Sequence, residues 1–244
     1  LQKMSSILDN ETFNKSIQNI MKNIIENEKH QKNINVNLVK YLDSYFSDKS
    51  STHSINDIYN ICCFIKEKDV FNIHYKRNLS KRIIRNTFAN CEKETQLITK
   101  LSSDSDSFVD ISHLQKIIKD YNVSQENLRE YQSIYDSPIS SYVITATVGI
   151  WQLQVYTPKE TYYCEQFKKN YETFKQNYTE FYKCKYEKRL LKFYDNYNTC
   201  VLEFHNNNRT YTLNCHLDIA DYLSQYNTCV SFPKKENDDK KLIK

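Results

Sequence analysis

The chain has 244 residues, of which 39% are hydrophobic and 26% charged, and its formal net charge is +4 at pH 7. A chain of this length can bury a substantial core in about one or two domains. One glycine and three prolines leave few positions for tight turns, which argues against sandwiches, barrels and propellers and favours a mostly helical chain. The single glycine also excludes glycine-rich phosphate-binding loops. No apolar stretch approaches the roughly 20 residues of a membrane span.

Residues 1–137 are predicted to form an α-helical bundle, because apolar residues recur there with the period of an amphipathic helix. The periodic stretches are 13–25, 36–46, 55–65, 70–83, 92–101 and 112–135. Ser54 and Asp57 form a weakened capping box for the third helix, and Asp69 is expected to cap the fourth. The fourth helix is expected to bury Val70, Phe71, Tyr75, Leu79 and Ile83 and to expose Lys76, Arg77, Lys81 and Arg82.

The pattern changes at Pro138, and residues 138–230 are predicted to form a small α/β domain that ends in a charged tail, 231–244. β-branched and aromatic residues predict extended segments at Tyr142–Thr147, around Trp151–Tyr156, and at Tyr186–Phe193, Thr199–Phe204 and Thr210–Asn214. Asn206, Asn207 and Asn208 can join the last two strands as a hairpin. A helix starting after Pro158 has an aromatic stripe that is expected to cover the sheet, and a final helix spans about Leu217–Tyr226. The stripe consists of Tyr163, Phe167, Tyr171, Phe174, Tyr178 and Phe181. The predicted fold class is therefore α+β and mostly helical.

No arrangement typical of catalysis or of cofactor or metal binding is evident. The glycine elbow that commonly presents a nucleophile is missing, and the six histidines are dispersed. The eight cysteines contain no C-x-x-C pair, and the hairpin candidates Cys200, His205, Cys215 and His216 match no usual zinc module. We therefore expect a non-catalytic protein without cofactor or metal. Its cysteines are expected to be reduced and buried, while an even number of them leaves a disulfide framework as an alternative.

A stripe of cations on the predicted fourth helix suggests attraction to phosphates or to an acidic peptide. It consists of Lys76, Arg77, Lys81, Arg82 and Arg85. A solvated helix face explains the same pattern. Because Phe71 and Tyr75 fall on the opposite side, the stacking platform of a single-strand binder is not indicated. We therefore expect no nucleic-acid or membrane partner. A nucleic-acid-binding module that uses this stripe is the alternative hypothesis.

The segment Phe64–Ile83, FIKEKDVFNIHYKRNLSKRI, closely resembles the most recognisable stretch of the cullin family. The resemblance continues downstream through CEKETQLITKL, LQKIIKDYNVSQENL, ITATVGIW, FKKNYETFKQNYTEFY, TCVLEF and TYTLNC, and upstream through NVNLVKYLDSYF. It covers about residues 10–228. Gln152 follows Trp151 where many cullins have proline, which indicates a divergent member.

The resemblance implies an intracellular scaffold, in the cytoplasm or nucleus, of a multi-subunit cullin-RING ubiquitin ligase. In cullins this C-terminal half contains a four-helix bundle and an α/β domain whose sheet accepts the N-terminal strand of a RING-box protein. The RING then recruits a ubiquitin-conjugating enzyme. Implied processes are protein ubiquitination, the Ubl conjugation pathway and ubiquitin-dependent protein degradation. Substrate adaptors would bind an N-terminal half, and winged-helix modules would follow the charged tail, both outside this sequence.

Within this resemblance, we predict that Tyr142–Thr147, Thr199–Phe204 and Thr210–Asn214 line the slot for the RING-box strand, which would pair with open backbone groups and insert alternate side chains. The candidate contacts are Val143, Thr145, Val201, Glu203, Tyr211 and Leu213. Residues Lys76, Arg77, Lys81 and Arg82 are candidates for attracting an acidic conjugating enzyme. The alternative function is an extracellular, disulfide-linked helical adhesion domain, motivated by the eight cysteines and the composition rich in Lys, Asn and Tyr.

Overall fold

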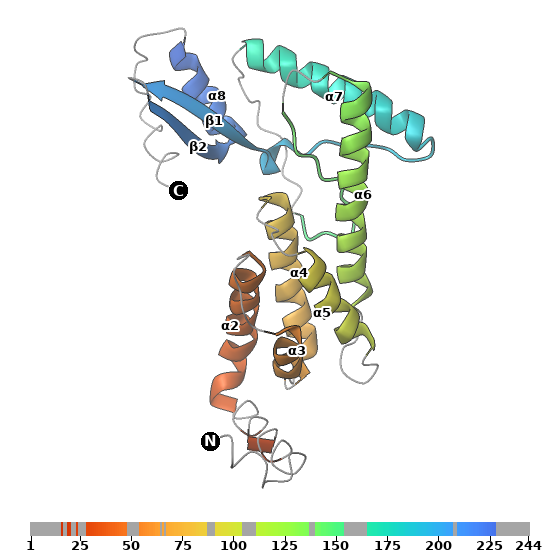
Figure 1. Ribbon diagram of the computed structural model, residues 1–244, viewed down its shortest axis with the longest axis vertical. Coiled ribbons are helices and arrows are strands. Elements are labelled where there is room, and N and C mark those ends of the chain that lie inside the picture. The colour runs from red at the N-terminus through yellow and green to blue at the C-terminus, as the bar shows by residue number, and fades with distance from the viewer. Residues whose placement is uncertain are drawn as a thin grey trace. The chain divides into compact units, whose positions relative to one another are not determined.

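A computed structural model describes residues 16, 19, 20, 23, 28–47, 54–63, 65, 67–86, 91–103, 111–136, 140–153, 165–206 and 209–227. The chain divides into two compact units. Unit 1 gathers the described residues up to Gln125 together with Ile144–Gln152, and unit 2 gathers Glu126–Val143 and those from Leu153 onward. Helices predominate, and the described residues form one two-stranded sheet, as Figure 1 shows. The predicted α+β, mostly helical class is confirmed.

Several predictions concern residues outside this described part of the chain. They are most of the first helix 13–25, the extended stretch 154–156, the helix start after Pro158, Tyr163, the turn residues Asn207 and Asn208, and the charged tail 231–244. The domain limits 1–137 and 138–230 stay a prediction. No helix within the described ranges combines the length and apolarity needed to cross a membrane.

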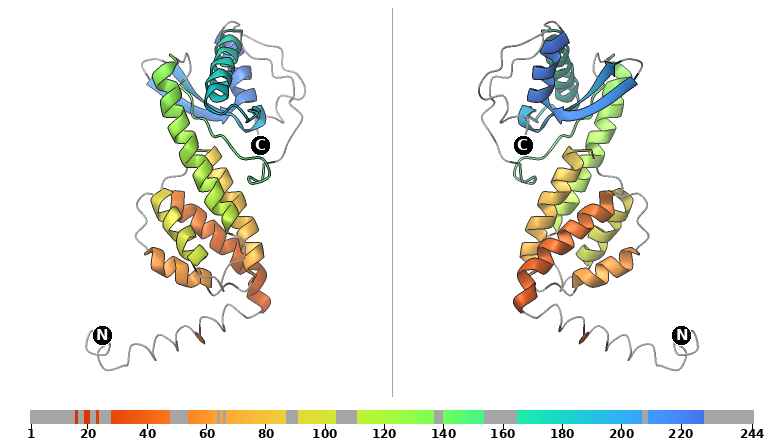
Figure 2. Two further views of the ribbon diagram at one scale, coloured as in Figure 1. Left: turned by 90° about the vertical axis from the view of Figure 1, so that its right-hand side faces the viewer. Right: turned by 90° about the vertical axis from the view of Figure 1, so that its left-hand side faces the viewer.

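Unit 1 is a group of helices whose periods match those predicted from the sequence. It contains α2 (Glu28–Ser47), α3 (Ile55–Cys63), α4 (Lys68–Ile84), α5 (Cys91–Ser103) and the first part of α6 (Ser112–Ile134). Helix α2 packs against α4 and α5, and α3 packs against α5 (Figures 1 and 2). The Ser54 hydroxyl caps α3 by accepting the Asn56 backbone N–H at 3.1 Å. Asp69 lies in the first turn of α4 and is not its cap, because the helix begins one residue earlier and Glu67 holds that position.

One face of α4 lies at the centre of the core of unit 1. Phe71, Tyr75, Leu79 and Ile83 are completely buried, as their spacing predicts. Val70 was also expected to be buried, but its side chain is 38% exposed. The reason is geometric, since one residue advances about 100° around an α-helix and therefore leaves the inward face.

Arg82 is buried, which corrects the prediction that it covers the solvent side of α4. Its position seven residues after Tyr75 is two helical turns away and thus on the same inward face. The guanidinium donates to Asp43 of α2 at 2.5 Å and to Glu94 of α5. It also lies 5.7 Å from the ring centroid of Phe46 and 5.8 Å from that of Tyr75. The Tyr75 hydroxyl donates to Glu94 at 2.6 Å, so α2, α4 and α5 meet at one buried cation.

The segment Ile144–Gln152 joins unit 1 through hydrogen bonds to Asp120 on α6. One oxygen of this buried carboxylate accepts the backbone N–H of Thr147 and the indole N–H of Trp151, each at 3.0 Å. The other oxygen accepts the Thr147 hydroxyl at 3.1 Å. Asp120 therefore fixes both the backbone of this segment and the position of its tryptophan.

The predicted strand Tyr142–Thr147 is absent from the structure, which leaves this segment without regular secondary structure. The backbone N–H of Thr145 donates to the Ser124 hydroxyl at 2.8 Å, and that of Thr147 donates to Asp120. These backbone donors bond to side chains of α6, so they are not used in a strand ladder. The prediction was wrong because β propensity says nothing about such side-chain acceptors.

Unit 2 has an aromatic core built largely by α7. Its elements are the last part of α6, α7 (Glu165–Lys185), η1 (Asp195–Tyr197), β1 (Thr199–Asn206), β2 (Arg209–His216), α8 (Leu217–Ser224) and η2 (Gln225–Asn227). The core cluster consists of Tyr131, Tyr171, Phe174, Tyr178, Phe181, Tyr182 and Leu217. The Tyr131 ring centroid of α6 lies 5.8, 5.3 and 5.8 Å from those of Phe174, Tyr178 and Phe181. The aromatic stripe of α7, which was expected to cover the sheet, thus packs mainly on α6. From the sheet, Cys200 packs against this core cluster.

The strands predicted at Thr199–Phe204 and Thr210–Asn214 are confirmed as β1 and β2, and the predicted final helix is α8 followed by η2. The strand predicted at Tyr186–Phe193 is wrong. The Tyr186 N–H donates to the Tyr182 carbonyl at 2.9 Å and continues the α7 pattern, and Arg189 closes a turn onto the Tyr186 carbonyl at 3.1 Å. The end of α7 therefore occupies the start of the expected strand.

Breaking the buried ion pair is expected to destabilise unit 1 strongly, because the remaining carboxylate stays buried. Substitution Arg82→Met leaves Glu94 buried without its cation, a change that typically costs about 3–5 kcal/mol. We expect the free energy of unfolding, measured by urea denaturation followed by circular dichroism, to fall by that amount. The control Lys81→Met changes the exposed neighbouring residue and should shift the free energy of unfolding by less than about 0.5 kcal/mol. Equal effects of the two substitutions would contradict the assignment.

Trp151 is the single tryptophan of the chain and is 5% exposed, so its fluorescence reports on the anchored segment. Asp120→Ala removes the acceptor of the indole N–H and of two Thr147 donors. We expect a red-shifted emission maximum and a loss of about 1.5–3 kcal/mol in unfolding free energy. Lys119→Ala, at an exposed position of the same helix, is the control. An unchanged emission maximum in Asp120→Ala would show that other contacts hold the segment.

Candidate protein-binding site

The hairpin β1–β2 has one apolar and one largely polar face. Its strands are antiparallel, and successive side chains of a strand point to opposite faces. One face carries the opposite pairs Cys200 with Cys215, Leu202 with Leu213, and Phe204 with Tyr211. We call these six residues the apolar face. The other face carries Thr199, Val201, Glu203 and His205, opposite His216, Asn214, Thr212 and Thr210.

The apolar face becomes more exposed with distance from the core of unit 2. Cys200 and Cys215 are half-buried, and Cys200 packs against the aromatic cluster. Farther along, Leu213 is 46%, Tyr211 50% and Phe204 60% exposed. The ring centroids of Phe204 and Tyr211 are 6.4 Å apart across the strands. A contiguous apolar surface of this kind is typical of a site that binds another protein.

Among the described residues, neither outer edge of the hairpin has a strand partner. Within the described part of the chain the sheet consists of β1 and β2 alone, so each outer edge has backbone N–H and C=O groups without a strand partner there. Helix α8 contacts both strands and lies beside them in Figure 1. A two-stranded hairpin is marginally stable by itself. An open edge beside an apolar face is a typical place for an added strand.

The structure brings together two of the six candidate contacts, Tyr211 and Leu213, on the apolar face. Val201 and Glu203 lie on the opposite face of the hairpin. Phe204 also lies on the apolar face and is more exposed than Tyr211, but it was not among the candidate contacts predicted from the sequence. The signal that could have identified it is the alternation of apolar residues in both strands, combined with the strand register.

The remaining two candidates, Val143 and Thr145, lie off the sheet. Val143 is half-buried and packs against the core cluster of unit 2. Thr145 belongs to unit 1, where its backbone N–H bonds to Ser124 on α6. In the structure these residues hold the segment between α6 and α7 in place.

The predicted cation stripe is smaller than expected because Arg82 is buried and paired. Arg77 and Lys81 are exposed on α4, Lys76 is half-buried, and Arg85 is exposed at the residue after the helix. We call Lys76, Arg77 and Lys81 the basic stripe. They lie in unit 1, whereas the apolar face lies in unit 2.

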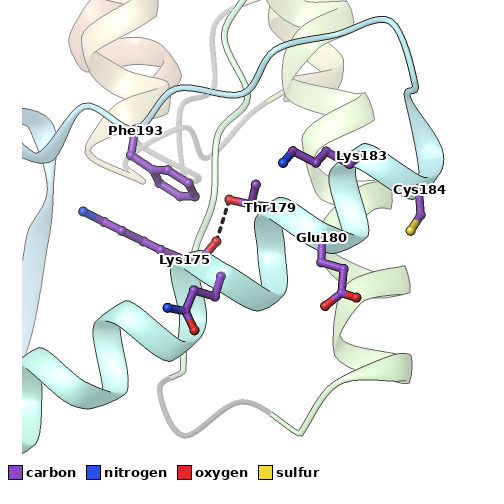
Figure 3. A pocket seen from close by; sticks show the side chains of 7 residues that line it. Lys175, Thr179, Glu180, Lys183, Cys184 and Phe193 are labelled. Atoms are coloured by element: carbon purple, nitrogen blue, oxygen red, sulfur yellow. Dashed lines mark hydrogen bonds between the residues drawn. The ribbon is translucent and has the colours of Figure 1, made fainter.

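A hollow of about 600 Å³ lies along α7, and Figure 3 shows its lining side chains. They are Lys175, Gln176, Thr179, Glu180, Lys183, Cys184 and Phe193. The Lys175 ammonium donates to Asp195 of η1 at 2.7 Å and lies 4.3 Å from the ring centroid of Tyr171. The Thr179 hydroxyl donates to the Lys175 carbonyl at 2.6 Å. These contacts attach η1 to α7 and form no arrangement typical of a catalytic site.

The six cysteines in the described part of the chain form no disulfide with one another. Burial raises the pKa of Cys62 to about 12 and that of Cys200 to about 11, and the neighbouring thiols Cys63 and Cys215 add to these shifts. Cys164 and Cys229 lie outside the described residues. The disulfide framework considered above therefore has no pair among the six.

The hairpin residues considered as metal ligands divide between its two faces. Cys200 and Cys215 lie on the apolar face, whereas His205 and His216 lie on the other. No group of three or more His, Cys, Asp or Glu side chains suited to a metal ion occurs among the residues that the structure describes. The four hairpin residues are thus not brought together.

Comparison with known proteins connects this chain to one family. A cullin family model, described as the cullin alpha solenoid domain, matches residues 1–128. Cullin-6 of Caenorhabditis elegans is 28% identical over 142 residues, which are 54% of this chain and 19% of the relative. Cullin-4A of Homo sapiens is 29% identical over 137 residues, or 54% of this chain and 18% of the relative. Cullin-1 of Dictyostelium discoideum is 31% identical over 130 residues, which are 48% of this chain and 17% of the relative. The matched region spans less than a fifth of each of these relatives.

Proposed function

This chain belongs to the cullin family, and on that premise we propose that it is the non-catalytic scaffold of a multi-subunit ubiquitin ligase. In this role the hairpin β1–β2 binds the extended N-terminal strand of a RING-box protein. The RING then positions a ubiquitin-conjugating enzyme. The observation that carries the proposal is the exposed apolar face beside strand edges that no other described residue pairs with.

Strand addition matches the physical chemistry of this hairpin. An added strand supplies main-chain hydrogen-bond partners to the open edge, and its alternate side chains can cover the apolar face. Each Å² of apolar surface removed from water contributes about 25 cal/mol, and Phe204, Tyr211 and Leu213 are at least 46% exposed. Partner binding would therefore stabilise the hairpin as well as the complex.

The proposed assembly works in protein ubiquitination and ubiquitin-dependent degradation, in the cytoplasm or nucleus. Substrate adaptors would bind elsewhere on the assembly. This chain would contribute position and not chemistry, because ubiquitin transfer would take place on the conjugating enzyme that the RING holds. The support for these roles is the family membership together with the protein-binding character of the hairpin.

The basic stripe provides a second, electrostatic contribution to this function. Arg77 and Lys81 are exposed on α4, and exposed cations attract an acidic partner over distances longer than a contact. We propose that the stripe raises the association rate of an acidic conjugating enzyme. Arg82 has no part in it, because its charge is used inside unit 1.

The apolar face can be tested by placing a charge on it. We expect Leu213→Asp to weaken binding of a full-length RING-box protein at least about tenfold, because an added strand would have to bury the carboxylate. Asn214→Asp places the same charge one residue away on the other face, opposite Val201, and should bind like the wild type. Affinity is measured by calorimetry on the full chain, and circular dichroism checks that both variants fold. Equal affinities of the two variants, or a folded wild type that binds no RING-box protein, would overturn the proposal.

The basic stripe is tested by reversing its charge with Lys76→Glu, Arg77→Glu and Lys81→Glu together. We expect ubiquitin-chain formation to slow about tenfold at low salt, with the difference vanishing at high salt as the charges are screened. The control reverses Lys168, Lys169 and Lys188 to Glu, which are exposed in unit 2. An unchanged rate at low salt in the stripe variant would remove the basic stripe from the mechanism.

A further inference from the structure

Two thiols face each other across the hairpin. Cys200 of β1 is the register partner of Cys215 of β2, so both side chains point to the same face of the sheet. Neither forms a disulfide in this structure. Cys215 also contributes to the raised pKa of Cys200.

The geometry of an antiparallel pair suits a covalent bond between these side chains. Directly opposite residues have Cα atoms about 4.5–5.5 Å apart, and disulfides span Cα separations of about 4.4–6.8 Å. The flanking pairs Leu202 with Leu213 and Thr199 with His216 keep the register on both sides. Little backbone movement is therefore needed to join Cys200 and Cys215.

The environment of the pair affects how fast the thiols exchange. Both thiols are half-buried, and burial raises the pKa of each, to about 11 for Cys200. Because the thiolate is the reacting form, a raised pKa slows exchange at neutral pH. The extent of oxidation at equilibrium is set by how well the fold holds the two sulfur atoms together.

We propose that Cys200 and Cys215 form a dithiol site that a small disulfide, such as oxidised glutathione, converts to a cross-strand disulfide. The thiolate of one cysteine attacks a sulfur of the small disulfide, breaks its S–S bond and releases one small thiol. The second cysteine then attacks the protein sulfur of the mixed disulfide and releases the other. The two protein thiols are oxidised and give up their protons, and the small disulfide is reduced to two thiols that carry those protons.

The bond fixes the register of the apolar face. It closes a covalent loop through the hairpin, so that Leu202 stays opposite Leu213 and Phe204 stays opposite Tyr211. The oxidised hairpin has fewer unfolded conformations and is expected to melt at a higher temperature. This chemistry uses residues of the hairpin alone and needs no RING-box protein.

The test uses the full chain at equilibrium in glutathione buffers of increasing oxidation. After an acid quench, free thiols are alkylated with N-ethylmaleimide and mapped by mass spectrometry. We expect Cys200 and Cys215 to lose alkylation together, with a cross-linked peptide that joins them. In concentrated guanidinium chloride, where the register is lost, the same buffers should yield at least about tenfold less of this cross-link, because the effective concentration of one thiol near the other falls.

Two variants separate this site from the other thiols. Cys215→Ser should leave Cys200 alkylated or bound to glutathione, and should abolish the rise in melting temperature on oxidation. Cys184→Ser removes an exposed thiol and should leave the cross-link unchanged. Independent glutathione adducts on Cys200 and Cys215, or cross-links of Cys200 to Cys164 or Cys229 instead, would overturn the proposal. RING-box binding by the reduced protein is measured separately, so failure of the cross-link does not bear on the scaffold role.

Discussion

The buried guanidinium of Arg82 is the constraint on which unit 1 depends. A charge removed from water is costly unless nearby groups replace the lost hydration. Here Asp43 on α2 and Glu94 on α5 accept its hydrogen bonds, and Phe46 and Tyr75 offer their rings. These partners come from separate helices, so α2, α4 and α5 must pack in a way that brings all of them to one place. Each of these helices thus supplies a group that contacts the same buried charge.

The two units differ in how far their irregular and strand segments are covered by other elements. In unit 1, Asp120 satisfies the donors of Thr147 and Trp151, so the returning segment is held by a helix. In unit 2, α6, α7 and α8 share an aromatic core, while the hairpin keeps an exposed apolar face and open edges among the described residues. We propose this face and these edges as the partner-binding part of unit 2, and the opposed thiols Cys200 and Cys215 lie at the end of the same face nearest the core.

Helix and strand predictions succeeded where the signal is local and failed where a distant group competes. The helical period of apolar residues in α2 to α6, and the alternation of apolar and polar residues in β1 and β2, can be recognised from residues close together in the chain. Tyr142–Thr147 has equally strong β propensity, yet Ser124 and Asp120 of α6 take its backbone donors. At Tyr186 the continuation of α7 prevails over the expected strand. The spacing of Arg82 places it on the inward face of α4, but its charge led to the prediction that it is exposed. Its carboxylate partners could not be recognised, because they are 39 and 12 residues away in sequence.

Local sequence patterns were enough to indicate the cullin family, through FIKEKDVFNIHYKRNLSKRI and the segments after it, and to predict the order of the described helices and the position of the hairpin. They also identified Tyr211 and Leu213 as candidates. The folded arrangement was needed to show that Phe204 lies beside them, that Val201 and Glu203 lie on the other face, and that the charge of Arg82 is buried and paired. The physical reason is that chain neighbours specify local conformation and periodicity, whereas register, burial and hydrogen-bond partners depend on which distant residues pack together.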